Sequence, residues 1–60
     1  MLGRTLREAA ARLHAAGVPS PAVDARLIAA HLLGVGPMEV LRHADGPVPH
    51  GFDGAVARRA

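Results

Sequence analysis

The first part of the chain has the hydrophobic spacing of an amphipathic helix. Over residues 6–13 one apolar residue in every three or four falls on a single stripe, and the charged side chains lie largely away from it. Thr5 and Glu8 have the spacing of a capping box, which predicts that the helix begins at Leu6. Gly17 provides the left-handed residue that commonly ends a helix, so we expect the helix to stop just before it.

A second and more apolar helix is predicted from Pro21 to Leu33. Ser20 is a suitable N-cap, and proline is favoured at the first helical position because its missing N–H would be unpaired there. Apolar residues cover more than one stripe of this segment, so we expect it to be the central, most buried helix, with Leu27 in the core. Gly34 and Gly36 follow the segment and stop it.

The rest of the chain predicts a short helix, a loop and a last helix. Residues 37–42 are long enough for a short helix, with Met38 and Leu41 facing inward. Residues 45–49 form a loop rich in glycine and proline. From about Gly51 the apolar spacing is helical again, and we expect this last helix to be cut short at the end of the sequence.

Length and composition limit the size of the core. Sixty residues allow one domain at most, so the sequence predicts a single all-α domain, residues 1–60, built as a small bundle of about four helices. A domain of this size buries only about 60% of the surface that its unfolded chain exposes. Half of the residues are hydrophobic, but one phenylalanine and no tryptophan or tyrosine leave a thin, aliphatic core. The lack of cysteine excludes a disulfide framework and a thiolate metal site.

Charge and hydropathy favour a soluble, cytoplasmic protein. The longest apolar stretch is interrupted by His31 and falls short of the roughly 18 residues that a membrane span needs. All seven basic residues are arginine, but the formal charge is only +2, which is weak support for nucleic-acid binding. Arg4, Arg7 and Arg12 among leucines and alanines are also typical of a transit peptide, although Glu8 fits a folded helix better.

No residue pattern favours catalysis or metal binding. No two histidines are three or four residues apart, as a helical metal site requires, and the single serine, Ser20, lies between two prolines. Asp24 and His31 point in nearly the same direction from one helix, but a rise of about 10 Å separates them and prevents a hydrogen bond. We therefore expect Asp24 to pair with an arginine of a neighbouring segment, with Arg42 as the candidate, and His31 to lie at the rim of the core.

A series of short motifs has the order found in one known family. The motifs are Leu6-Arg7-Glu8-Ala9, the Ser20-Pro21 connection, Asp24-Ala25 with Leu27-Ile28, His31-Leu32-Leu33-Gly34, and Arg58-Arg59. In this order they resemble the N-terminal domain of the release-factor glutamine methyltransferases, the HemK/PrmC type, over essentially the whole chain. The chain departs from the family pattern at Arg26, where an acidic residue is common, and matches it weakly over residues 43–50.

The resemblance implies a helical domain that precedes an S-adenosylmethionine-dependent catalytic domain. Family members methylate the side-chain amide of the glutamine in the Gly-Gly-Gln tip of peptide chain release factors. Their Asn-Pro-Pro-Tyr loop and glycine-rich cofactor loop are not found here, so no catalytic, cofactor-binding or metal residue is assigned in this chain. We expect a non-catalytic, substrate-positioning part with a release factor as its partner, and Arg12 and Arg42 as candidate contact residues.

Two other classes of protein remain open at this point. In a helix-turn-helix DNA-binding module, the segment Pro21–Leu33 would have to read bases, but it offers only Asp24, Arg26 and His31 for that purpose. In a dimerisation or docking module, the apolar second helix would complete its core with a partner chain. Neither a membrane nor direct nucleic-acid contact is expected from the favoured interpretation.

Overall fold

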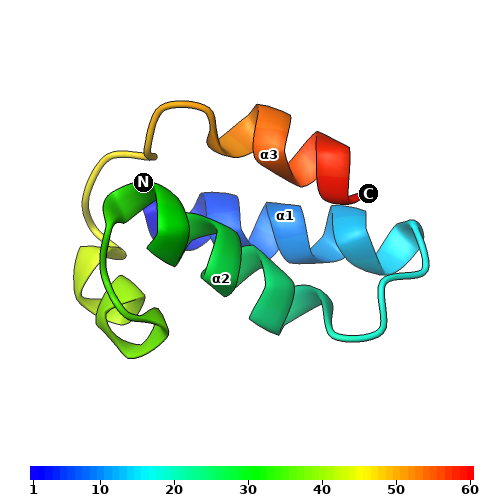
Figure 1. The fold of residues 1–60 in the computed structure, drawn as a ribbon, viewed down its shortest axis with the longest axis horizontal. Helices are drawn as coiled ribbons and strands as arrows, with labels where there is room; N and C mark the ends of the chain where they lie inside the picture. The colour runs from blue at the N-terminus through cyan, green and yellow to red at the C-terminus, as the bar shows by residue number, and fades with distance from the viewer.

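Four helical segments and no strand make up the structure, a computed structural model that describes residues 1–60 (Figure 1). They are α1 (Leu2–Ala15), α2 (Pro21–Leu33), the 3-10 helix η1 (Pro37–His43) and α3 (Phe52–Arg59). α2 runs against the direction of α1 and α3, and it contacts each of the other three segments. The predicted all-α class and the number of helices are confirmed.

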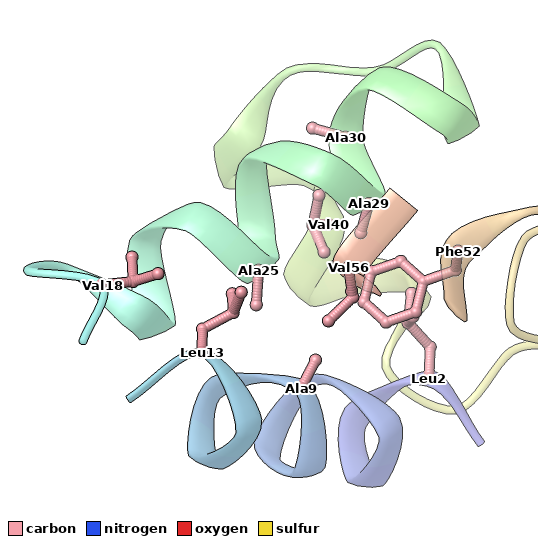
Figure 2. Packing of buried hydrophobic residues seen from close by; sticks show 10 residues of the cluster. All are labelled: Leu2, Ala9, Leu13, Val18, Ala25, Ala29, Ala30, Val40, Phe52 and Val56. Carbon is pink, nitrogen blue, oxygen red and sulfur yellow. The ribbon is translucent and has the colours of Figure 1, made fainter. Parts of the chain in front are cut away.

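The core contains ten buried residues, all of them hydrophobic (Figure 2). Its largest fully buried side chains come from α1, η1 and α3, namely Leu2, Leu13, Val40, Phe52 and Val56. α2 contributes only alanines, namely Ala25, Ala29 and Ala30. Because alanine adds so little volume, α2 lies close to its neighbours, and their larger side chains fill the space around it.

The prediction that Leu27 lies in the core is wrong, although Ile28 and Leu33 of the same helix are partly buried against it. Val23 and Leu27 are each 47% exposed, although the helix itself is central in the fold. Nearly every face of this helix is apolar, so the spacing of its hydrophobic residues did not indicate which face is buried. The face with the small side chains is buried because it allows the closest approach of three neighbouring segments.

The predicted start of the first helix at Leu6 is also wrong, because α1 begins at Leu2. The backbone N–H of Leu2 donates to the carbonyl of Gly46 at 3.0 Å, and that of Gly3 donates to Ala44 at 2.9 Å. These two carbonyls accept hydrogen bonds from backbone N–H groups in the first turn, which a capping side chain would otherwise have to satisfy. The hydroxyl of Thr5 instead donates to the carbonyl of Met1 at 3.2 Å, so the capping box does not form.

The glycine predicted to end the first helix does so. Gly17 has φ +86°, and Val18 N–H donates to the carbonyl of Leu13 at 3.0 Å. α2 ends in the same way at Gly34, with φ +72° and a 3.0 Å bond from Val35 N–H to Ala30. Both ends are Schellman motifs, in which glycine adopts the left-handed conformation without a steric penalty.

The start of the second helix follows the prediction in position but not in chemistry. α2 spans Pro21–Leu33, with Ser20 at the N-cap and Pro21 at the first helical position. No side-chain hydrogen bond from Ser20 caps the helix. The predicted bounds of the helix are confirmed, whereas the predicted capping by the Ser20 side chain is not found.

The short third segment lies where the sequence predicted it, but with the opposite face inward. Val40 is fully buried, whereas Met38 and Leu41 are exposed. In a 3-10 helix residues three apart lie on one face, so Met38 and Leu41 turn away from the core together.

The last helix, α3, is found where it was predicted. No helix of the structure has the length and apolarity to cross a bilayer.

Truncating a core leucine tests this packing against an exposed leucine of the same type. Leu13→Ala is expected to lower the free energy of unfolding by about 2–5 kcal/mol, because it removes a fully buried side chain. Leu27→Ala is expected to lower it by less than about 1 kcal/mol. Urea denaturation followed by circular dichroism measures both, and an equal loss for the two variants would contradict the described core.

A pair of glycines close in sequence tests the helix end. Gly34 has a positive φ and Gly36 does not, and a Cβ at either position would meet no atom within 4 Å. Gly34→Ala is therefore expected to cost about 1–2 kcal/mol through backbone strain alone. Gly36→Ala is expected to be neutral or to stabilise by about 0.4–1 kcal/mol. Thermal melts of both variants check this, and identical melting temperatures would argue against a left-handed Gly34.

Candidate functional site

The structure brings together no cluster of side chains suited to metal binding. No group of three histidine, cysteine or acidic residues lies close enough to hold an ion. All four histidines are exposed, including His31, which was predicted at the rim of the core. The candidate site is therefore a surface, and its chemistry comes from arginines.

Asp24 has an arginine partner, as expected, but the partner is Arg59 and not Arg42. Nη2 and Nε of Arg59 lie 2.9 and 3.0 Å from Oδ2 of Asp24, and the Asp24 side chain is only 22% exposed. The pair joins the first turn of α2 to the last turn of α3. Arg42 forms no ion pair in the structure and lies exposed on η1.

Arg12, one of the two predicted contact residues, also forms an ion pair within the chain. Its Nη1 lies 2.9 Å from Oδ1 of Asp53, which is 93% exposed. This pair joins α1 to the first turn of α3. Together with the Asp24–Arg59 pair, it holds α3 against one flank of α1 and α2.

The other five arginines have no carboxylate partner within the chain, namely Arg4, Arg7, Arg26, Arg42 and Arg58. Two of them line one hollow of about 290 Å³, which we call the Arg7–Arg26 groove. α1 supplies one wall with Gly3, Leu6, Arg7 and Ala10, and Ala22, Arg26, Leu41 and Ala44 complete the lining. An adjoining hollow shares Gly3, Arg7 and Ala44 and adds Met1, Arg4 and Asp45.

The helical repeat explains why this groove lies away from α3. Gly3, Leu6, Arg7 and Ala10 have the i, i+3, i+4, i+7 spacing of one helix face. Thr5, Glu8 and Arg12 lie on the other flank of α1, where they line a separate hollow against α3. Residues of the groove face are therefore not covered by α3.

The groove has an apolar floor, and Arg7 and Arg26 are the two charged residues of its lining. Leu6 and Ala10 are half-buried, and Leu41, which also lines the groove, is 60% exposed. Arg26 is half-buried, whereas Arg7 is exposed. Neither guanidinium donates a hydrogen bond to another side chain. Such a surface suits an apolar group accompanied by carboxylates.

Sequence reasoning did not single out Arg7 and Arg26. The sequence predicted that both are charged residues of helices. That they line the same groove depends on how α1 and α2 pack against each other. The spacing of residues 3, 6, 7 and 10 was a usable signal for a flank with a mixed apolar and basic character. The packing geometry of α1 against α2 cannot be predicted from a pattern in a single sequence.

By fold and surface, the chain is a small all-α module with an exposed surface that is both basic and apolar. A family model described as the PrmC N-terminal domain matches residues 4–60. The chain belongs to this family, which confirms the resemblance seen in the sequence.

Two curated relatives are release factor glutamine methyltransferases. That of Corynebacterium glutamicum is 59% identical over 98% of this chain, and that of Rhodospirillum rubrum is 43% identical over 98% of it. The matches cover 21% and 19% of the relatives, so the chain spans about a fifth of their length. No solved structure gives a significant match.

The two ion pairs are expected to differ in strength because their burial differs. Asp24→Asn should lower the free energy of unfolding by about 1 kcal/mol, through the lost pair and the lost charge at the start of α2. Asp53→Asn, at a far more exposed position, should lower it by about half as much. Denaturation at low and high salt measures both, and a larger loss for Asp53→Asn would contradict this ranking.

Proposed function

We propose that this chain is the substrate-positioning N-terminal part of a peptide chain release factor glutamine methyltransferase. The observation that carries the proposal is the match of residues 4–60 to the PrmC N-terminal domain, supported by two relatives with that enzyme name. Its partner is a release factor. Its own residues perform no methyl transfer, and S-adenosylmethionine belongs to the catalytic part of the parent enzyme.

A positioning role is physically reasonable for a module of this kind. A glutamine at the tip of a loop offers little surface for recognition, so an enzyme gains affinity from a second contact with the body of its substrate. That contact raises the effective concentration of the glutamine at the catalytic site. An arginine that has no carboxylate partner within the chain, such as Arg42, is a side chain suited to such a contact with an acidic surface.

Arg12 and Arg42 stay in the proposal as predicted contact residues. Arg42 is exposed and unpaired, so it is free to meet a carboxylate of the partner. Arg12 would have to break or share its ion pair with Asp53, which is exposed enough to exchange with water.

A cytoplasmic location and the lack of direct nucleic-acid contact are part of the same proposal. The exposed face of α2 carries Val23, Leu27 and His31, which argues against reading of bases.

Direct binding to a release factor tests the proposed function. Titration of the chain with purified release factor from the same organism, followed by calorimetry, is expected to give a saturable complex. Leu13→Asp places an unpaired charge in the core and unfolds the module, so this variant is expected not to bind. The complete absence of binding by the unmodified chain would contradict the proposal.

The coding sequence downstream of Ala60 provides an independent check. A parent enzyme of this class is expected to continue into a glycine-rich cofactor loop followed by Asn-Pro-Pro-Tyr. An unrelated domain at that point would argue against the proposed function.

A further inference from the structure

We propose that the Arg7–Arg26 groove is the docking site for a short release-factor segment in which an apolar side chain lies between carboxylates. The inference rests on the proposed function and assigns its contact surface. It differs from the predicted contacts at Arg12 and Arg42, neither of which lines the groove.

The apolar floor of the groove supports the first half of this assignment. Leu41 exposes 60% of its surface to water, and it lines the hollow together with the half-buried Leu6 and Ala10. Burying these side chains under an apolar group of a partner is favourable, because it removes their surface from water. Gly3 and Ala22 add little side-chain volume to the lining, so a side chain of a partner can reach the floor.

The unpaired arginines support the second half. Arg12 and Arg59 lie 2.9 Å from carboxylates of their own chain, whereas Arg7 and Arg26 have none. One of these two guanidinium groups comes from α1 and the other from α2, so carboxylates on both sides of an inserted apolar side chain would each have a partner. No acidic residue lines the groove itself, and Asp45 lies only in the adjoining hollow.

The dimensions of the groove favour a short segment. Along α1 its wall extends from Gly3 to Ala10, a rise of about 10 Å, which matches two turns of a helix or a few extended residues. A volume of about 290 Å³ holds a few side chains and not a larger element. The floor also disfavours nucleic acid, whose phosphates gain nothing from leucine and alanine.

The exposed Val23 and Leu27 of α2 are the other apolar feature of the surface. Neither of them lines a hollow of the surface, so nothing at that face selects an occupant. They therefore provide a comparison surface rather than a second site.

Substitutions at the groove, with matched controls elsewhere, test the assignment by calorimetric titration with purified release factor. Arg7→Glu and Arg26→Glu are each expected to weaken binding about tenfold or more, because each replaces a guanidinium with a repelling carboxylate. Arg58→Glu makes the same change of charge on α3, outside the groove, and is expected to stay within about twofold of the unmodified chain.

A second pair of variants tests the floor. Leu41→Ser removes an apolar side chain of the groove and is expected to weaken binding about tenfold. Met38→Ser makes a comparable change on the same 3-10 helix at a position that is 74% exposed and outside the groove, so it should bind normally. Circular dichroism of each variant confirms that its helices are intact, since all five positions lie outside the buried core.

The salt dependence of binding separates ion pairing from a general structural effect. Affinity of the unmodified chain is expected to fall as salt rises, and Arg7→Glu is expected to reduce that dependence. Normal binding by the groove variants alongside binding of the unmodified chain would overturn the groove while leaving the proposed function intact. Failure of the unmodified chain to bind would overturn both. Equal losses for Arg58→Glu and Arg7→Glu, or self-association through the groove, would also overturn the assignment.

Discussion

The structure depends on the alanine face of α2. Ala25 and Ala29 are almost completely buried, and they allow α2 to lie close to α1 and α3 at the same time. Larger residues at these positions would force the helices apart, and a chain of this length has no second core to compensate. The bulky core side chains therefore come from the neighbouring segments, as Figure 2 shows for Leu13, Phe52 and Val56.

This packing makes the surface asymmetric. α3 covers one flank of α1 and α2, where two ion pairs join it to them, and the Arg7–Arg26 groove, bordered by η1, lies away from α3. The arginines on the covered flank pair with carboxylates of the same chain, whereas Arg7 and Arg26 on the open flank do not. The same arrangement that stabilises the fold thus leaves a basic, partly apolar surface exposed.

The sequence predicted those features that depend on neighbouring residues. Pro21 and Gly17 mark helix ends through their own backbone preferences, so the bounds of α2 and the end of α1 were predicted correctly. The start of α1 depends on carbonyls of residues 44 and 46, and the partner of Asp24 lies 35 residues away. Burial of Leu27 was predicted wrongly because an all-apolar helix has no distinct inner face, and Arg26 could not be placed in the groove without the crossing of two helices.

Chemical-shift mapping by nuclear magnetic resonance tests the central claim most directly. The isotopically labelled chain would be titrated with unlabelled release factor while its backbone amides are observed. Our account predicts that shifts and line broadening concentrate at residues 3–10, 22–26 and 41–44, with little change along α3. Changes centred on Leu27 and His31, or on the outer face of α3, would contradict it.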